Sequence, residues 1–323
     1  VGSNVTMIAE NSPSSALTIS TTALPVNSNG TTLANNNASG SALFTVSGGV
    51  RGTGDLVLNN NSAITNGIKL SVTAITNLGR IVNSGTGSGD TLISAVIGTN
   101  VIGVVQDSAT SPLVLSGANT YTGGTVIANG SLRVTNTTGS ATGSGAVNID
   151  NGGTLQGNGR IQGVVTNNNG GTLSPGIDGT AGGTLTVSNL TWNGGGVFHC
   201  EVASIAAEAA GVGIDYDTLM VNESVTVVTN GTNLVIRMDS LGQTLAFQTN
   251  RNYGLKVIAW GTAANINPSD VTLETNLFLV DGTWFVTNLN KSIYVVCMGA
   301  TSTNKNYWTG TGTWSTVANW SLG

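Results

Sequence analysis

The chain has 323 residues and a net charge of −5, and only 8% of its residues are charged, against about 25% in ordinary soluble domains. Its ten lysines and arginines are scattered, which excludes the basic stripe that nucleic-acid binding requires. No run of about 18 apolar residues is present, which excludes a membrane-spanning helix in this sequence. Asparagine, serine, threonine and glycine replace the missing charge, and these residues favour turns and stacked polar ladders.

Residues 1–40 are rich in asparagine and serine and contain only short apolar islands, such as Leu17–Ile19. We expect this segment to be an arm that could dock on a neighbouring subunit. The sequence begins at Val1 without a charged and then apolar leader. A secretion signal is therefore expected to have been removed or left out.

Short apolar runs separated by glycine or asparagine characterise residues 41–199. Examples are Ala42–Val46, Leu56–Leu58, Ile68–Val72 and Val101–Val105. Strands this short, with turns this frequent, favour a parallel β-helix over a β-sandwich.

A repeated motif supports this prediction. Residues 115–134 form two β-runs joined by turn residues, and Gly-Gly-Thr-Leu recurs at 152–155, 170–173 and 182–185. A unit this short cannot bury its own apolar face, so it must stack on its neighbours.

The spacing of core leucines predicts the length of the coils. Val114 to Leu132 is 18 residues, Leu132 to Leu155 is 23, and Leu155 to Leu173 is 18. The pattern then breaks, and Pro175 indicates a loop that leaves the stack.

Longer alternating strands characterise residues 200–302, for example Gly254–Trp260 and Ser292–Met298. They predict an antiparallel β cap or small sandwich that covers the end of the solenoid. Residues 303–323 are a separate Trp-rich segment, which we interpret as a candidate junction between subunits. The aromatic residues proposed for this junction are Tyr307, Trp308, Trp314 and Trp320. Stacking of these rings on sugars is the alternative interpretation.

Catalytic and metal-binding patterns are weak. His199 is the only histidine, and its neighbour Cys200 would point to the opposite face of a strand, so the two cannot act as a pair. Asp215 and Asp217 share a face if extended, but Ca²⁺ would need more oxygen ligands than these two supply. We therefore expect turn-stabilising roles for them and predict no catalytic, cofactor-binding or metal residues.

The two cysteines, Cys200 and Cys297, lack the spacing of a zinc site. In an exported protein they could form one disulfide. The alternative is two buried thiols on strands, and the sequence leaves both open.

The run from Leu115 to Val134 resembles the autotransporter-associated β-strand repeat, as do Gly143–Gly163 and Gly-Gly-Thr-Leu-Ser-Pro-Gly at 170–176. Asp215–Val221 resembles the segment that follows the last repeat in that family. The resemblance implies an all-β fold, a right-handed parallel β-helix, together with bacterial secretion and a location at the cell surface or beyond it. It brings no catalytic residues, and we expect a passenger-type piece rather than a complete autotransporter.

These features together predict a non-catalytic structural protein that joins copies of itself end to end into a fibre or matrix. One alternative is a monomeric rod-like adhesin that binds surface glycans or host surfaces. A second is a β-helix polysaccharide lyase or hydrolase, which would require acids and a base on one face. No cofactor is expected, and the partners expected are copies of the chain and surface glycans.

Overall fold

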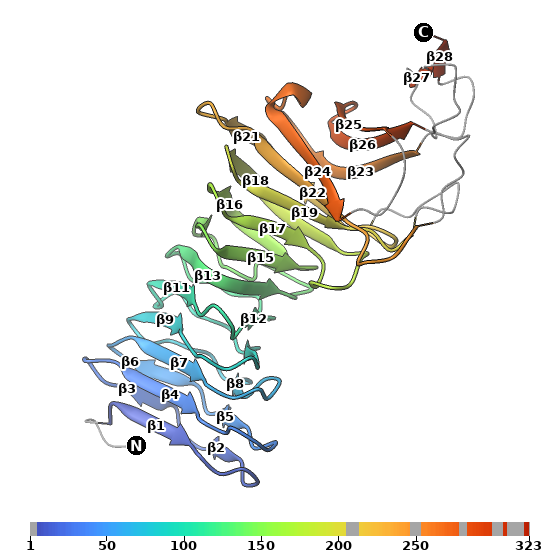
Figure 1. The fold of residues 1–323 in the computed structure, drawn as a ribbon. Helices are drawn as coiled ribbons and strands as arrows, with labels where there is room; N and C mark the ends of the chain where they lie inside the picture. Colours follow the sequence, from blue (N-terminus) through green and yellow to red (C-terminus); the bar gives the residue numbers. More distant parts are fainter. Residues whose placement is uncertain are drawn as a thin grey trace.

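The computed structural model describes residues 5–204, 213–245, 253–277 and 283–298, together with the backbone of residues 306–308 and 320–322. Short strands stack along an elongated rod that begins at the N-terminal coil (Figure 1). Each strand pairs in parallel with strands of the coils before and after it, which defines a parallel β-helix. The predicted fold class is confirmed.

The stack has three faces, and the first is the most continuous. Its strands are β1 (Met7–Glu10), β4 (Thr31–Asn35), β7 (Leu56–Asn60), β9 (Arg80–Asn83), β11 (Gly103–Asp107), the first part of β13 (Thr125–Val134), β14 (Val147–Ile149), the second parts of β16 (Arg160–Asn167) and β18 (Thr184–Asn193), and β21 (Val225–Val228).

The second face carries the site described below. Its strands are β2 (Leu17–Ile19), β5 (Phe44–Val46), β8 (Ile68–Leu70), β10 (Thr91–Ile93), β12 (Leu113–Leu115), the second part of β13, β15 (Gly153–Gly157), β17 (Thr172–Pro175), β19 (Val197–Glu201), β22 (Leu234–Asp239) and β24 (Val271–Leu277).

The third face is built from β3 (Leu24–Val26), β6 (Val50–Gly52), the first parts of β16 and β18, β20 (Thr218–Val221) and β23 (Tyr253–Trp260). After β6, the third face continues into the next two coils through isolated parallel bridges, from Val50 to Ile75 and from Ile75 to Ile97. A short 3₁₀ turn, η1 (Pro268–Asp270), precedes β24.

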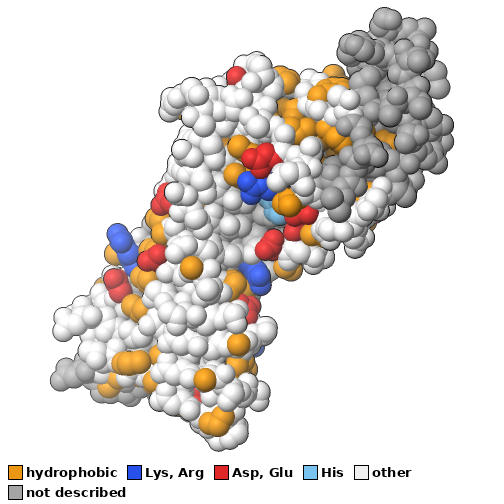
Figure 2. All heavy atoms as spheres, in the orientation of Figure 1, with side chains coloured by type: hydrophobic (Ala, Val, Ile, Leu, Met, Phe, Trp, Pro, Cys, Tyr) orange, Lys and Arg blue, Asp and Glu red, His pale blue; other side chains and the backbone are white. Residues whose placement is uncertain are grey.

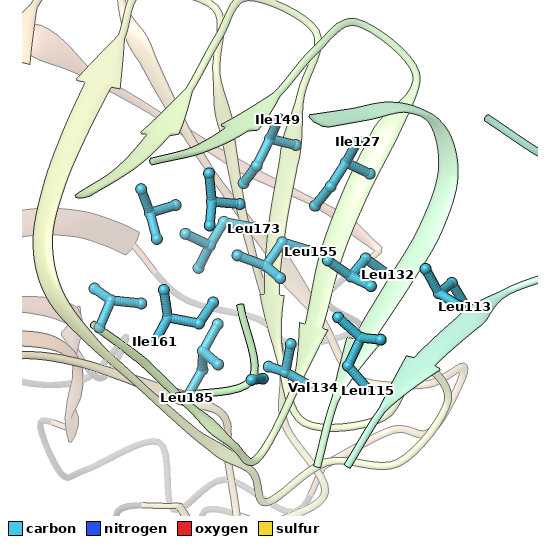
Figure 3. Close-up of a cluster of buried hydrophobic side chains, with 14 of the residues drawn as sticks. Leu113, Leu115, Ile127, Leu132, Val134, Ile149, Leu155, Ile161, Leu173 and Leu185 are labelled. Atoms are coloured by element: carbon cyan, nitrogen blue, oxygen red, sulfur yellow. The ribbon is translucent and has the colours of Figure 1, made fainter. Parts of the chain in front are cut away.

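Inward side chains at alternate positions of each strand, such as Leu113 and Leu115 of β12, fill the shared core (Figure 3). Leu132 pairs in register with Leu155, and Leu155 with Leu173, as their spacing in the sequence predicted. The preceding partner of Leu132 is Leu113 rather than Val114, which pairs with Arg133 and is only half-buried. The predicted partner of Leu132 was therefore one residue out of register. Adjacent residues of a strand face opposite sides, so Val114 points away from the core while Leu113 points into it.

Residues 1–40 contain strands that pair with the stack. Within this segment β1 pairs in parallel with β4, and β2 and β3 pair with the next coil. Two inward apolar side chains per short strand are enough for a coil that stacks on a neighbour, as the buried Leu24 and Val26 illustrate. The polar residues between them lie in turns or point outward.

The solenoid also continues beyond the boundary expected at residue 199. β22 and β24 pair in parallel with β19 and with each other, and β20 pairs in parallel with β18 and β23. Antiparallel pairing in the main sheet involves β26 (Ser292–Met298), which lies between β23 and β25 (Thr283–Asn288). The alternation that favoured an antiparallel cap also arises in coils, because every coil strand has one core face and one outer face.

The Trp-rich segment is described only in part. The backbones of β27 (Asn306–Trp308) and β28 (Trp320–Leu322) pair antiparallel, with Trp308 opposite Trp320. Trp314 lies outside the described residues. The junction that we predicted at Tyr307, Trp308, Trp314 and Trp320 therefore stays a prediction.

Amide side chains form ladders along the stack, as the composition indicated. On the outside, Asn61 Nδ2 donates to Asn36 Oδ1 at 2.8 Å, and Asn36 Nδ2 donates to Asn11 Oδ1 at 3.0 Å. Inside the turn, Asn60 is fully buried and its Nδ2 donates to the Asp90 carbonyl at 2.9 Å. Buried amides with fixed partners specify the turn geometry, whereas exposed ones exchange with water.

Asn60→Ala is expected to lower the free energy of unfolding by about 2 kcal/mol, because it leaves buried hydrogen-bonding groups of the turn without partners. Asn61→Ala, at the adjacent half-buried position on the outside of the stack, is expected to cost less than about 1 kcal/mol. Denaturant unfolding followed by circular dichroism measures both. Equal losses in the two variants would contradict the distinction between the buried and the exposed ladder.

Candidate functional site

A loop leaves the second face after β17 and folds back over it. This segment, residues 176–183, is called loop 176–183 below. Gly176 N–H donates to the Gly157 carbonyl at 3.0 Å, and a tight turn joins Ile177 to Thr180. Gly176 and Gly182 have φ of 88° and 93°, in the region that favours glycine. The loop expected at Pro175 is therefore present, and it covers polar side chains of the second face.

Two buried carboxylates hold this loop through its backbone. Glu201 accepts the N–H groups of Gly179 at 2.7 Å and Thr180 at 3.0 Å. Asp217 Oδ1 accepts the N–H groups of Gly182 at 3.0 Å and Gly183 at 2.8 Å. Four backbone donors of one short loop thus depend on two side chains from later coils.

Burial changes the protonation of both acids. Glu201 is 1% exposed and Asp217 is fully buried. Loss of hydration raises the pKa of Glu201 above its usual range and raises the pKa of Asp217 to about 7, although the N–H donors partly oppose the shift. Asp217 therefore titrates near neutral pH, which few carboxyl groups do.

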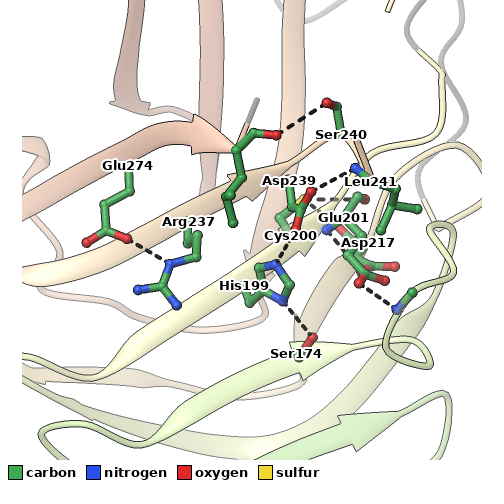
Figure 4. A network of polar contacts seen from close by, with 12 residues as sticks. Ser174, His199, Cys200, Glu201, Asp217, Arg237, Asp239, Ser240, Leu241 and Glu274 are labelled. Atoms are coloured by element: carbon green, nitrogen blue, oxygen red, sulfur yellow. Dashed lines mark hydrogen bonds and ion pairs between the residues drawn. The ribbon is translucent and has the colours of Figure 1, made fainter. Parts of the chain in front are cut away.

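His199 lies beside these acids on β19, with its side chain 14% exposed. Its Nδ1 is 3.3 Å from Ser174 Oγ in the coil before, and its Nε2 is 3.5 Å from Asp239 Oδ2 in the coil after (Figure 4). One ligand atom each from Asp178, His199 and Glu201 lie within 4.8 Å of one another. We call Asp178, His199, Glu201 and Asp239 the histidine–carboxylate cluster.

The Ser174–His199–Asp239 arrangement does not present a nucleophile. Ser174 is 2% exposed, so a polymeric substrate cannot approach its hydroxyl. Both contacts of the imidazole are longer than the hydrogen bonds that link an activated serine to its base. The contacts orient the imidazole ring instead.

A polar stripe continues along the outer side of the second face. Arg237 occupies the position next to His199 in the following coil, and its Nε contacts Glu274 Oε2 at 2.7 Å in the coil after that. Figure 2 shows the surface as mostly uncharged, with the histidine beside acidic and basic side chains. This stripe is one of the few places where acidic and basic side chains lie next to one another.

The cysteines do not form a disulfide in the described structure. Cys200 and Cys297 are both buried, and the Cys200 thiol donates to the Asp217 carbonyl at 3.4 Å. Burial raises the pKa of both thiols. Cys200 lies on β19 and Cys297 on the antiparallel strand β26, and a disulfide between them stays a prediction.

The sequence predicted the orientation of individual polar residues in this region, but not which of them lie close together. His199 points outward and Cys200 inward, as strand geometry predicted. The sequence grouped Asp215 with Asp217 on one face, whereas the acids that lie close to His199 are Asp178, Glu201 and Asp239. The signal that could have found them is a shared register position in successive coils, as Glu201 pairs with Asp239.

Comparison with known families identifies one coil. Residues 113–134 match the model of the passenger-associated-transport-repeat family. The match spans β12 and β13, from Leu113 to Val134, and Leu113 pairs in register with Leu132. The passenger repeat is therefore one turn of the solenoid plus the strand that starts the next, and the resemblance seen at Leu115–Val134 is confirmed there.

The passenger-repeat match does not include the histidine–carboxylate cluster, which lies in later coils. No curated protein matches the chain. Within the described residues, no helix has the length and apolar character needed to cross a membrane.

Proposed function

We propose that this protein is a non-catalytic structural component of the bacterial cell surface or the extracellular space, built on a passenger-type β-helix. The observation that carries the proposal is the continuous parallel stack from β1 to β24, one coil of which matches the passenger repeat. Such a stack makes a stiff rod, and passenger repeats belong to exported surface proteins. The repeat supplies length and rigidity and no reacting groups.

The proposal extends to end-to-end association of copies of the chain. Terminal coils of a β-helix present backbone N–H and C=O groups that can pair with another strand. Natural sheets discourage such pairing with lysines at their edges. None of the four lysines of this chain, Lys69, Lys256, Lys291 and Lys305, lies in β1, β2, β3 or β24. Low charge elsewhere further reduces repulsion between copies.

Electron microscopy of the purified chain over a range of concentrations tests association. We expect rods that lengthen by end-to-end contact as the concentration rises. Isolated rods of one length at every concentration would contradict association. Protease treatment of intact cells that produce the protein tests location separately, since a surface protein is cleaved without lysis.

The adhesin alternative rests on the exposed amide ladder that includes Asn36 and Asn61, since its side chains offer donors and acceptors at regular spacing to sugar hydroxyls. It predicts that single rods bind defined glycans on an array and that binding survives when association is absent. The lyase or hydrolase alternative predicts cleavage of polysaccharides by the purified chain. Filaments without either activity would support the structural role.

A further inference from the structure

The histidine–carboxylate cluster has the composition of a site for a transition-metal ion. An imidazole nitrogen and two carboxylate oxygens, from His199, Asp178 and Glu201, already lie within 4.8 Å of one another. Zinc holds such ligands at about 2.0–2.2 Å, which places neighbouring ligand atoms about 3.4 Å apart in a tetrahedral shell. A shift of about 1.5 Å or less closes the site. Asp178 can supply it, because its side chain is exposed and lies in a turn.

The imidazole has one nitrogen that makes no hydrogen bond. Its Nε2 is buried and lacks a hydrogen-bond partner, and the nearest charged atom is Asp239 Oδ2 at 3.5 Å. In the tautomer in which Nδ1–H donates to Ser174 Oγ, the Nε2 lone pair is free to bind a metal ion. In the other tautomer Nε2 carries the proton and faces Asp239.

The local charge favours the metal. Asp178, Glu201 and Asp239 lie around one imidazole, and the nearest arginine on the polar stripe, Arg237, is engaged with Glu274. A single proton leaves this group of acids with excess negative charge, whereas a divalent ion neutralises more of it.

Glu201 is already positioned as a ligand. Each of its oxygens accepts one backbone N–H from loop 176–183, which fixes the carboxylate and leaves a lone pair on each oxygen. Backbone bonds of this kind orient metal ligands in many proteins. Asp178 belongs to the same loop, and one of its oxygens lies within 4.8 Å of a ligand atom of both Glu201 and His199.

We propose that Asp178, His199 and Glu201 bind one divalent transition-metal ion, with zinc as the best match to one nitrogen and two oxygen ligands, and that Asp239 supports the site from the next coil. The exposed side of Asp178 leaves a fourth position for water. The bound ion would tie loop 176–183 to β19. This inference stands apart from the proposed structural function, since either can fail without the other.

Isothermal titration of the intact, metal-free chain with Zn²⁺ tests the proposal, with Ca²⁺ as a comparison. We expect one Zn²⁺ per chain and an increase in unfolding temperature on binding. Asp178→Asn and His199→Gln are each expected to weaken Zn²⁺ binding at least tenfold. Asp107→Asn, an exposed acid at the end of β11, removes the same charge away from the cluster and is expected to leave binding unchanged.

Substitution with Co²⁺ gives a second measurement that does not depend on stability, since a tetrahedral nitrogen–oxygen site absorbs visible light. Circular dichroism of Asp178→Asn checks that the variant folds, and the exposed position of Asp178 makes this the cleaner variant. The proposal would be overturned if the wild-type chain showed no saturable binding of Zn²⁺ and NMR showed that His199 is protonated beside Asp239. Equal weakening by Asp107→Asn would also overturn it, because the ion would then be held by surface charge alone.

Discussion

Gly130→Ala is expected to destabilise the protein by about 3 kcal/mol or more. Gly130 lies within β13, in the passenger-repeat coil, where the chain turns from the first face to the second. Its φ is 65°, and a Cβ atom there would lie 1.9 Å from the Ser108 carbonyl oxygen of the preceding coil. That oxygen belongs to the backbone and cannot rotate away, so the coils must separate locally.

Gly231→Ala is the matched control for this prediction. Gly231 has φ of 81°, yet nothing lies within 4 Å of the position its Cβ would take. The substitution therefore adds only the strain of a left-handed alanine, about 1 kcal/mol. Thermal and denaturant unfolding of both variants measures the difference. A loss in Gly130→Ala no greater than in Gly231→Ala would show that the coils tolerate the methyl group and that stacking distance does not select glycine.

The core of the stack could be predicted from the sequence because one inward leucine per coil leaves a periodic signal. Leu132, Leu155 and Leu173 were identified in this way, and they pair in register. The loop at Pro175 followed from the break in that spacing. These predictions succeeded because they depend on alternation and turn chemistry, which act over a few residues.

The extent of the solenoid could not be predicted in the same way because coil length varies. Partners are 25 residues apart between Met7 and Thr32, 18 between Leu155 and Leu173, and 39 between Val221 and Trp260. Because the spacing between partners varies, the repeat cannot be recognised from residue spacing alone in the first and last coils. Strand alternation then gives the same pattern for a coil as for an antiparallel sheet, so the pattern alone does not show where the coils begin and end.

The histidine–carboxylate cluster was missed for a related reason. His199 is 25 residues after Ser174 and 40 before Asp239, so no short motif joins them. Their proximity depends on the register of three coils of different lengths. Asp178 and Glu201 meet only because loop 176–183 folds back over the face, a path that its glycines permit but do not specify.

The stability of the protein is expected to depend on pH through Asp217, more strongly than through any exposed acid. Burial raises the pKa of this carboxyl from 3.8 to about 7 in the folded protein. Between these values the folded chain holds a proton that the unfolded chain has released, so this contribution to stability is fully present below about pH 4. It is lost as the pH rises through 7, and between pH 5 and 8 the loss is about 2–3 kcal/mol.

Asp217→Asn isolates this effect. The amide oxygen of asparagine can still accept the N–H groups of Gly182 and Gly183, while its NH₂ group replaces the oxygen that accepts the Glu201 N–H at 3.2 Å. The variant is therefore expected to be less stable than the wild type at pH 5 and to approach or exceed it at pH 8. Denaturant unfolding at several pH values measures the two slopes, with Asp107→Asn as an exposed control that keeps the wild-type slope. Parallel curves for the wild type and Asp217→Asn would mean that the buried carboxyl does not change protonation on folding, and that its hydrogen bonds to loop 176–183 fully offset its loss of hydration.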